Sequence, residues 1–421
     1  MRFLFLTTLY STETANPYMT DELAEGLIAR GHCVDVLLID WDAVSSPDSC
    51  EVRGRNGERI VRVTPRALRK FGKVIFRASK LLLSSRYAAA AMLRHFDCRQ
   101  HDAVIAWTPA ISIGAPLRRA VRGGIPHRLL IIFDFFPMCH REAGIIRSRL
   151  VYWVARQFEE RLYRLFTGFI ANLPGNVEYL RRHFPVSPGA RVLCSPIWGD
   201  TTMPPPQERA EVRTRLSLPL DRPIAVFGGQ FSEGRGIEQM IGAAQIAEQV
   251  GTPTLYLFIG EGRLRPMIED AARRCANIRL QAPVTRSEYL SLIGACDIGM
   301  VATIKEFTSS AFPSKTIDYL RAGLPIVTAV EPASDYPALL EPYMVIRNVE
   351  CGDSAAFQAA VEEFAINAQP CASVRELARR CLEEVFDVRH AVNAVLRAVG
   401  EPADLQDDHT KPIVRRMAVT A

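Results

Sequence analysis

The sequence lacks the features that mark membrane-spanning, zinc-binding or disulfide-rich proteins. Its ten cysteines form no C-x-x-C pair, which favours reduced thiols in a cytosolic protein over a zinc site or a disulfide framework. No segment reaches about 18 uninterrupted apolar residues, so we expect no transmembrane helix. The opening residues lack the long apolar stretch and the cleavage site of a signal peptide. These absences together predict a cytoplasmic protein.

The sequence also has only a small excess of positive over negative charge. The net charge is only +5, and neither a long Lys/Arg run nor an RNA-binding aromatic motif is present. Such a mild excess fits an anionic ligand or an acidic membrane surface, whereas nothing points to nucleic acid. With 421 residues, of which 48% are hydrophobic, the chain is long enough for two globular domains.

Short apolar runs alternate with helical periodicity along the chain, which predicts an α/β fold with parallel sheets. The opening reads as a strand, a helix and a strand at Arg2–Thr7, Asn16–Arg30 and Cys33–Ile39. The other expected strands are Ala103–Ala106, Leu129–Phe133, Gly168–Ala171, Ile224–Phe227, Thr254–Ile259, Asn277–Leu280, Ile298–Ala302 and Pro325–Val330. The last expected helices are Ala355–Ala365 and Val374–Leu396.

The alternation is interrupted once, by a polar stretch that bears three consecutive prolines at 204–206. We therefore expect an N-terminal Rossmann-like domain at 1–198, a linker at 199–222 and a second Rossmann-like domain at 223–375. Two successive open sheets predict a cleft between the halves. Residues 399–421 read as a flexible polar tail.

Ligands bind outside the carboxyl ends of the strands in open parallel sheets, so residues directly after strands are candidates for the site. Two glycine-bearing turns in the second half fit this rule. Glycines let the backbone approach a ligand closely, and an arginine can grip phosphate oxygens in two places. The candidates there are Gly229, Gln230, Arg235, Gly260 and Gly262. The first turn taken alone is equally compatible with an ordinary connection, and a turn such as the second, taken alone, is more often an ordinary connection.

A longer loop precedes the helix expected at Thr316–Ala322. Asp318, near the start of that helix, can accept hydrogen bonds from the two hydroxyls of a ribose. Loop amides, with the side chains of Ser309, Ser310 and Lys315, can hold a diphosphate, and Ser314 can cap the helix. A surface loop followed by a capped helix is the alternative interpretation.

The run from Phe312 to Val327, which contains the Pro313-Ser314-Lys315 triplet, resembles the donor-site segment of glycosyltransferase family 4. The turn Gly229–Gly236 and the strand end Leu257–Gly262 fit the same family pattern. The resemblance implies a GT-B fold, that is, two Rossmann-like domains with an interdomain cleft. It also implies a retaining, metal-independent hexosyltransferase of polysaccharide or glycolipid biosynthesis. No cofactor is expected, because the nucleotide sugar, a UDP- or GDP-sugar, is the substrate.

The resemblance also assigns roles to single residues. Arg235 falls on the phosphate-binding lysine of the family, and Asp318 on the second carboxylate of its E-x7-E motif. Pro283 and Val284 fall where the backbone meets the base. With Lys315, Arg235 is expected to stabilise the charge on the leaving diphosphate. By analogy with GT-B enzymes, a helix at 376–398 is expected to cross back to the first domain.

Two positions depart from the family pattern. Gln230 stands where an arginine is usual, and Ser310 stands where the first glutamate of the motif is usual. These departures keep open a catalytically inactive, nucleotide-sugar-binding partner of a polysaccharide complex. A second alternative is a non-hydrolysing nucleotide-sugar epimerase, which needs no acceptor.

The N-terminal half offers candidates for the acceptor side. Asp134, His140, Arg141 and Glu142 follow an expected strand, and an imidazole there can polarise the acceptor hydroxyl. A structural role is the alternative for His140. The first loop contributes Thr14, Ala15 and Asn16, which are small enough to admit a diphosphate.

The segment Arg66–Arg94 carries basic residues at three- and four-residue steps, which is typical of an amphipathic helix at a membrane surface. A helix packed on the sheet with a solvated basic side is the alternative. Contact with the inner membrane surface would suit a polyprenyl-diphosphate-linked saccharide as acceptor.

Overall fold

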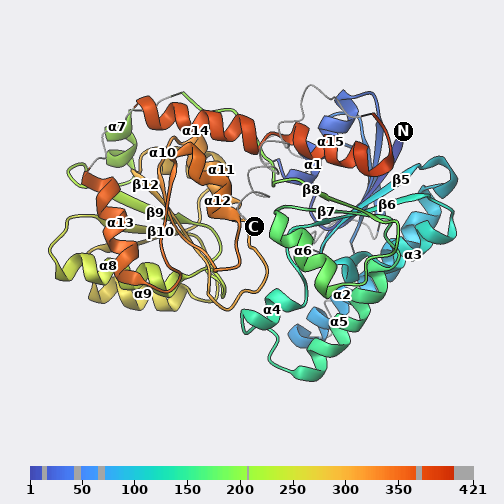
Figure 1. Cartoon of the computed structure of the whole chain (residues 1–421), viewed down its shortest axis with the longest axis horizontal. Helices are drawn as coiled ribbons and strands as arrows, with labels where there is room; N and C mark the ends of the chain where they lie inside the picture. Colours follow the sequence, from blue (N-terminus) through green and yellow to red (C-terminus); the bar gives the residue numbers. More distant parts are fainter. Residues whose placement is uncertain (12–16, 42–48, 65–71, 206–207, 367–371, 403–421) are drawn as a thin grey trace. The chain divides into compact units, whose positions relative to one another are not determined.

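The computed structural model describes residues 1–11, 17–41, 49–64, 72–205, 208–366 and 372–402, with the backbone alone at 72–83 and 372. The chain folds as two compact units (Figure 1). Unit 1 comprises Met1–Arg141, Ile146–Gly199 and the helix that begins at Val388, and unit 2 comprises residues 142–145 and 200–387. The last helix of the described residues therefore belongs to the unit that contains the N-terminus.

Unit 1 is built on an eight-stranded sheet with the order β3-β4-β2-β1-β5-β6-β7-β8. All neighbouring strands pair in parallel except β3 and β4, which form an antiparallel pair at the edge. The strands are β1 (Arg2–Thr7), β2 (Cys33–Ile39), β3 (Ser49–Arg53), β4 (Arg59–Val63), β5 (Ala103–Trp107), β6 (His127–Ile132), β7 (Gly168–Ala171) and β8 (Arg191–Cys194).

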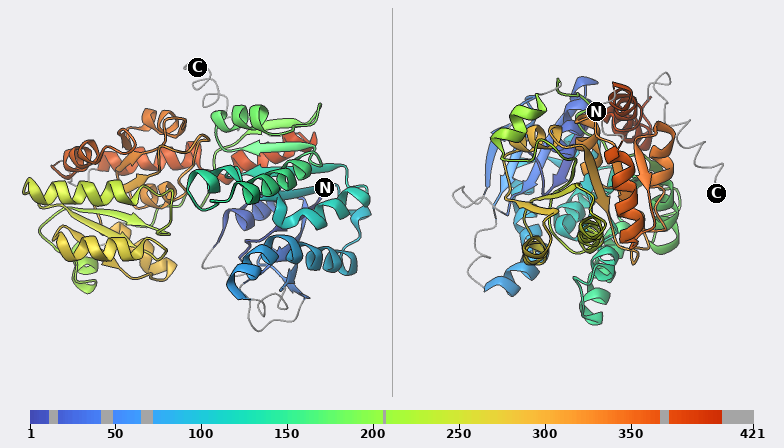
Figure 2. Two further views of the ribbon diagram at one scale, coloured as in Figure 1. Left: turned by 90° about the horizontal axis from the view of Figure 1, so that it is seen from below. Right: turned by 90° about the vertical axis from the view of Figure 1, so that its left-hand side faces the viewer.

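Helices cover both faces of this sheet (Figure 2). The helices of unit 1 are α1 (Met19–Ala29), α2 (Gly72–His95), α3 (Gly114–Arg122), α4 (Met138–Glu142), α5 (Arg149–Tyr163), α6 (Pro174–His183) and α15 (Val388–Val399), with 3-10 turns η2 (Cys98–Gln100) and η3 (Ala110–Ile113). One face buries apolar side chains of α1 and α15, such as Leu27 and Val395, and the other those of α2, α3 and α5, such as Met92, Leu117 and Leu162. Alternate residues of each buried strand pack into the apolar clusters on the two faces of the sheet, because side chains along a strand alternate between faces.

Unit 2 repeats the design on a six-stranded, fully parallel sheet with the order β11-β10-β9-β12-β13-β14. Its strands are β9 (Ile224–Gly228), β10 (Leu255–Ile259), β11 (Ile278–Gln281), β12 (Ile298–Ala302), β13 (Ile326–Ala329) and β14 (Ile346–Asn348). Its helices are α7 (Arg209–Arg215), α8 (Ile237–Gln249), α9 (Arg265–Arg274), α10 (Arg286–Gly294), α11 (Lys315–Arg321), α12 (Tyr336–Leu340), α13 (Ser354–Ile366) and α14 (Ala372–Val385), with η4 (Glu341–Tyr343). Helices α8, α9 and α13 cover the face opposite to α10, α11 and α12 (Figure 1).

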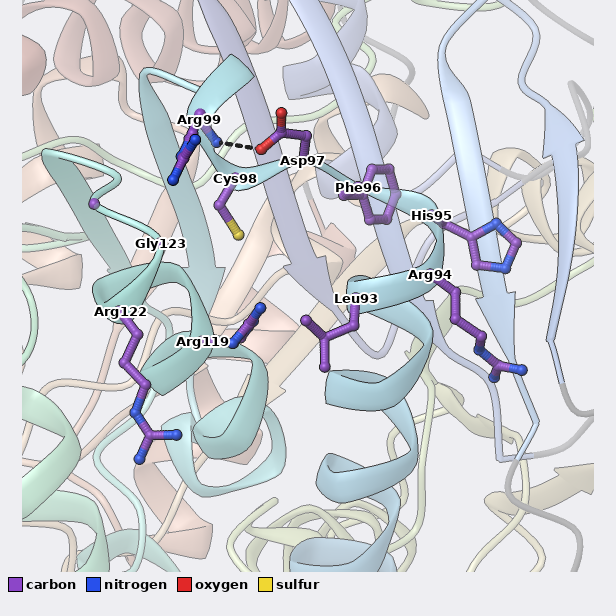
Figure 3. Close-up of a pocket in the computed structure, with 11 residues that line it drawn as sticks. Leu93, Arg94, His95, Phe96, Asp97, Cys98, Arg99, Arg119, Arg122 and Gly123 are labelled. Atoms are coloured by element: carbon purple, nitrogen blue, oxygen red, sulfur yellow. Dashed lines mark hydrogen bonds between the residues drawn. The ribbon is translucent and has the colours of Figure 1, made fainter.

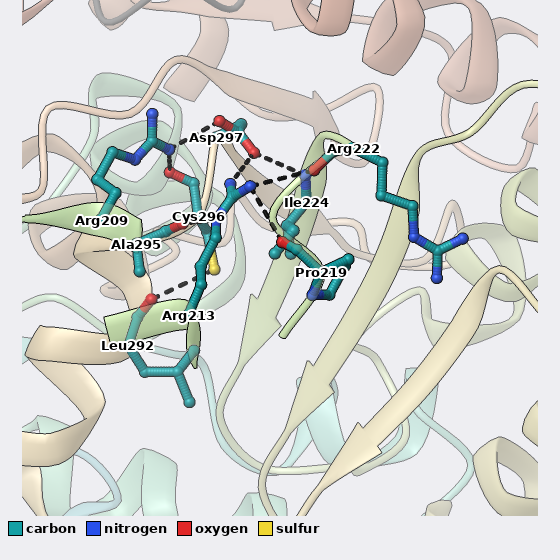
Figure 4. A network of polar contacts seen from close by, with 9 residues as sticks. All are labelled: Arg209, Arg213, Pro219, Arg222, Ile224, Leu292, Ala295, Cys296 and Asp297. Carbon is teal, nitrogen blue, oxygen red and sulfur yellow. Dashed lines mark hydrogen bonds and ion pairs between the residues drawn. The ribbon is translucent and has the colours of Figure 1, made fainter. Parts of the chain in front are cut away.

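A buried polar network fastens α7 to the amino ends of β9 and β12 (Figure 4). Asp297 accepts from Arg213 at 2.6 Å, from Arg209 at 2.7 Å and from the Ile224 N–H at 2.7 Å. The Arg213 side chain is 9% exposed and the Asp297 side chain 8%. Arg213 also donates to the carbonyls of Pro219, Arg222 and Ala295. Each buried charge is thus paired and hydrogen-bonded, which offsets the cost of removing it from water. The stretch expected to be a linker, 199–222, accordingly contains a helix that is anchored to unit 2.

The α/β pattern expected from the sequence is confirmed, and most of the expected strands lie within one or two residues of the observed ones. The single helix expected at Val374–Leu396 is wrong, since α14 ends at Val385 and α15 begins at Val388. Strands β3, β4, β8 and β14 were not expected, because short, partly exposed strands carry little apolar periodicity. No helix among the described residues is long and apolar enough to cross a bilayer.

Candidate functional site

A cavity of about 440 Å³ lies at the carboxyl end of the sheet of unit 2. Its volume is within the usual range for small-molecule sites. Nine of the residues expected at the donor site line it, namely Gly229, Gln230, Arg235, Gly260, Pro283, Val284, Ser314, Lys315 and Asp318. Five further residues complete the lining, namely Gly228, Ile259, Glu261, Arg286 and Tyr289. The two glycine turns and the start of α11 therefore converge on a single cavity.

The glycines of the second turn are required by close backbone packing. A Cβ atom at Gly260 would lie 1.9 Å from the Gly229 carbonyl oxygen, and one at Gly262 would lie 2.1 Å from the Phe231 carbonyl oxygen. Both glycines have positive φ, 145° and 154°, a conformation that residues with a side chain rarely adopt. Gly262 packs behind the first turn and does not line the cavity, in contrast to its expected position. Its contribution is to let the two turns meet.

Two backbone amides in these turns are already bonded within the protein. The Gly229 N–H donates to the Ile259 carbonyl at 2.9 Å, and the Gly260 N–H donates to the Gln281 carbonyl at 3.4 Å. These glycines therefore bring the backbone close to a ligand without offering it these N–H groups. The groups that bind a phosphate in this cavity must therefore be cationic side chains and the N–H groups of other residues.

Lys315 is one of the cations that line the cavity. Its ammonium lies 4.2 Å from the centroid of the Phe227 ring, and a Cβ atom at Gly229 would lie 3.8 Å from its Cε. Among the described residues, no carboxylate forms an ion pair with it. Burial, and secondarily the charge of Arg235, lowers the pKa of Lys315 to about 7. An anion in the cavity would favour the charged ammonium, because opposite charge raises the pKa of a lysine.

Asp318 faces the same cavity and is held in a fork by Arg286. One guanidinium nitrogen of Arg286 donates to Asp318 Oδ2 at 2.7 Å, and a second donates to Oδ1. The Asp318 side chain is 15% exposed and the Arg286 side chain 37%, so the carboxylate is the more shielded partner of the pair. The fork fixes the orientation of the carboxylate, and its remaining lone pairs can accept from ligand hydroxyls.

Arg286 and Tyr289 are the functional candidates that the sequence reasoning missed. Both lie on the first turn of α10, which follows β11, so the rule about strand ends applied to them as well. Helical spacing brings them together, with the Arg286 guanidinium 5.8 Å from the Tyr289 ring centroid. The resemblance assigned Pro283 and Val284 to this strand end, but no motif in the sequence marks Arg286 or Tyr289.

The serines of the long loop have different places. Ser309 and Ser310 are 8% and 4% exposed and do not line the cavity. The Ser310 hydroxyl donates to the Ala333 carbonyl at 2.7 Å, so it holds the loop. Ser314 lines the cavity at the N-cap position of α11, but its side chain makes no capping hydrogen bond, contrary to expectation. The expected serine cap is therefore wrong.

The N-terminal candidates lie directly after β6. Asp134 is exposed, and His140, on α4, is half-buried with its Nδ1 3.2 Å from the Cys139 sulfur and its ring edge against Phe136. The Arg141 guanidinium donates to the carbonyls of Ile146 and Arg147, which is a structural use. Glu142 ends α4 and is half-buried. Thr14, Ala15 and Asn16 lie outside the described residues.

Unit 1 also holds a buried carboxyl that the sequence analysis did not single out. Glu159 on α5 is fully buried and accepts from the N–H groups of Ala110 and Ile111 at 2.7 and 2.8 Å. Burial raises its pKa to about 8. These bonds tie α5 to η3, beyond the carboxyl end of β5. No group of three or more His, Cys, Asp or Glu side chains suited to a metal was found in the described part of the chain.

Comparison with known proteins identifies related sequences and folds. Residues 17–198 match the family model of the glycosyl transferase 4-like domain. No curated protein matches the sequence.

Several solved structures share the fold over essentially the whole chain. Sucrose-phosphate synthase from Thermosynechococcus elongatus is 14% identical, with a TM-score of 0.67 and 100% coverage of both chains. The Anabaena protein HepE in complex with UDP-glucose is 12% identical, with a TM-score of 0.66 and coverage of 95% of this chain and 99% of that one. Trehalose 6-phosphate synthase from Burkholderia multivorans is 11% identical, with a TM-score of 0.65 and coverage of 100% and 98%. At these identities the similarity establishes the fold, two Rossmann-like domains of the GT-B type.

Proposed function

We propose that this chain, which has the GT-B fold and whose residues 17–198 match the glycosyl transferase 4-like domain, is a glycosyltransferase that transfers a hexose from a nucleotide sugar with retention. The acceptor is a saccharide or a lipid-linked saccharide, and the product belongs to a surface polysaccharide or a glycolipid. The nucleotide sugar occupies the cavity of unit 2. We place the enzyme in the cytoplasm, with contact to the inner membrane surface when its acceptor is polyprenyl-linked.

One observation carries this proposal, namely that Arg235, from the turn after β9, and Lys315 and Asp318, from the first turn of α11, line one cavity. A nucleotide sugar needs cations for its diphosphate and a carboxylate for its ribose. Cleavage of the bond between the anomeric carbon and the phosphate oxygen leaves negative charge on the diphosphate. Lys315 and Arg235 stabilise that charge, and they do so strongly because the lysine is already desolvated.

The donor base lies against Pro283 and Val284, which follow β11 and line the cavity on the side of Arg286. The Anabaena HepE structure contains UDP-glucose, which supports a UDP-sugar as the first donor to test. A GDP-sugar is the second. Gln230, where the family usually has an arginine, adds no charge, so the phosphate site depends on two cations.

On the acceptor side we propose that His140 orients or polarises the acceptor hydroxyl, with Asp134 near the transferred sugar. The roles of Arg141, Glu142 and the first loop, Thr14 to Asn16, stay predictions. The amphipathic segment Arg66–Arg94 is our candidate for contact with an acidic membrane surface. Of this segment the structure describes Gly72 onward as α2.

The test is calorimetric titration with UDP-, GDP-, ADP- and CDP-sugars, repeated on Arg235→Ala and Asp318→Ala. Each substitution should weaken binding of the selected donor by about tenfold or more, since each removes a charged hydrogen-bonding partner. Arg263→Ala is the matched control, because Arg263 is 64% exposed and does not line the cavity. Unchanged donor binding in the Arg235 and Asp318 variants would show that the donor site is elsewhere.

Turnover then separates the three candidate functions. Nucleotide release that depends on a saccharide or polyprenyl-linked acceptor supports the transferase. Conversion of the nucleotide sugar to its epimer without an acceptor identifies an epimerase instead. Tight donor binding with no release for any acceptor identifies the inactive binding partner.

A further inference from the structure

Unit 1 contains a second cavity, of about 660 Å³, which we call the arginine pocket (Figure 3). It lies between the end of α2, the η2 turn and the end of α3. Its lining includes Arg94, Arg99, Arg119 and Arg122. Figure 3 shows the Arg119 side chain between Cys98 and Leu93. Four arginines from three separate elements thus contribute to the lining of one cavity; Arg94, Arg99 and Arg122 are exposed and Arg119 is half-buried.

The fold creates this pocket through a close approach of two turns. A Cβ atom at Gly123 would lie 2.3 Å from the Cys98 Cβ, so only glycine lets the end of α3 reach the η2 turn. Both turns lead directly into strands, η2 into β5 and Gly123–Gly124 towards β6. The pocket therefore lies at the amino ends of these strands, at the opposite edge of the sheet from Asp134 and His140. It is separate from the expected acceptor residues.

The positive charge of the arginine pocket is poorly compensated by the protein. Many arginines elsewhere in the described chain are paired, but no ion pair joins any of these four to a carboxylate of the described residues. Asp97 is the acidic residue of the lining, and it accepts from the Arg99 backbone N–H at 3.0 Å. The Arg119 Nε is buried without a hydrogen-bond partner in the described structure. Buried donors of this kind are normally satisfied, so a missing acceptor is indicated.

We propose that the arginine pocket is a binding site for a phosphate- or pyrophosphate-bearing anion. Guanidinium groups present planar pairs of donors that match phosphate oxygens, and they remain charged at all physiological pH values. A bound anion adds negative charge to this cationic lining and supplies an acceptor for Arg119. The cavity has the volume of a small-molecule site, so a phosphorylated molecule fits as well as a bare ion.

The same chemistry can come from a soluble molecule or from a lipid headgroup. Leu93, which lines the pocket, is 53% exposed, and Val121 on α3 is 36% exposed. Apolar side chains beside a cationic pocket suit a phospholipid surface, whereas the depth of Arg119 suits a soluble phosphate ester. Both sources require the same arginines, and the experiment below separates them.

The test is calorimetric titration of the whole protein with inorganic pyrophosphate at low ionic strength. The Arg235→Ala/Lys315→Ala background removes the donor cavity as a competing site. In this background Arg99→Gln/Arg119→Gln should weaken pyrophosphate binding by about tenfold or more. Arg118→Gln is the control, because Arg118 lies on the same helix, is exposed and does not line the pocket. Circular dichroism of each variant checks that the fold is retained.

A parallel arm uses vesicles of phosphatidylcholine with and without phosphatidylglycerol. If the Arg99/Arg119 variant loses pyrophosphate binding but keeps phosphatidylglycerol-dependent sedimentation, a soluble phosphorylated ligand is supported. If the same variant loses phosphatidylglycerol-dependent sedimentation but keeps pyrophosphate binding, a lipid headgroup in the pocket is supported. Binding of neither probe to the parent protein overturns the proposal. An equal loss in the Arg118 control also overturns it, since diffuse surface charge would then explain binding.

Discussion

The affinity of the donor cavity for a nucleotide sugar should fall as pH rises from about 6 to about 8.5. The cause is Lys315, whose pKa is lowered to about 7 by burial and then by the charge of Arg235. A bound diphosphate holds the ammonium form and raises this pKa, so binding takes up a proton above pH 7. The diphosphate of a nucleotide sugar is a diester whose charge is constant over this range. The pH dependence therefore reports the protein.

The expected magnitude follows from the fraction of Lys315 that carries the charge. With a pKa of about 7 in the free protein, that fraction is about 0.9 at pH 6 and about 0.03 at pH 8.5. If only the ammonium form binds, the Kd rises about 30-fold between these pH values, which corresponds to about 2 kcal/mol. At pH 8 binding should take up about 0.9 proton.

The assay is isothermal titration calorimetry with UDP-glucose, or GDP-mannose if the donor screen selects guanine. Each pH is measured in two buffers of different ionisation enthalpy, which yields the proton uptake directly. Lys315→Arg should remove the pH dependence, since a guanidinium stays charged. Lys305→Ala is the control, because Lys305 is exposed and outside the cavity, and it should keep the full dependence.

Two results would refute this reasoning. A wild-type affinity that is constant over the pH range would show that the Lys315 pKa is not depressed or that the lysine does not meet the phosphate. A dependence of the same size in Lys315→Arg would assign the titration to another group. Either result would leave the cavity itself in place and would change the account of how it binds phosphate.

Three further predictions concern other groups. Arg286→Gln and Asp318→Asn should each weaken nucleotide-sugar binding by about tenfold. Because the two residues act as one pair, calorimetry of the double variant should show little additional loss of affinity. Fully additive losses would contradict this. Asp297→Ala should lower the free energy of unfolding in urea by about 3–5 kcal/mol, because it leaves buried arginine charge uncompensated, whereas the exposed control Asp270→Ala should lower it by less than about 1 kcal/mol. Burial raises the pKa of Glu159 from 4.5 to about 8, so the folded state retains a proton that the unfolded state releases, and the free energy of unfolding should fall as pH rises through this interval. Urea titrations at several pH values should show a smaller slope for Glu159→Gln, and an unchanged slope would exclude Glu159 as its source.

The sequence by itself determined the alternation of strands and helices and the position of the strand ends in unit 2. Runs such as Ile298–Ala302 are buried on both faces of a parallel sheet. Their residues are therefore continuously apolar, and such a run can be recognised as a strand in the sequence. The turn after β9 and the start of α11 could be named as a site for the same reason. A parallel sheet brings its carboxyl ends to one edge, wherever those ends lie in the sequence.

Only the tertiary structure decided which of these residues share the cavity and what state they are in. Gly262 and Ser310 are residue types typical of ligand-binding loops. In the structure Gly262 packs against backbone and Ser310 donates a hydrogen bond to the Ala333 carbonyl, so both have structural roles. The pairing of Arg286 with Asp318 spans elements that are distant in sequence. The depressed pKa of Lys315 arises from surroundings that fold around it. Burial and long-range pairing depend on which chain segments exclude water from one another, and no local pattern of residues encodes that.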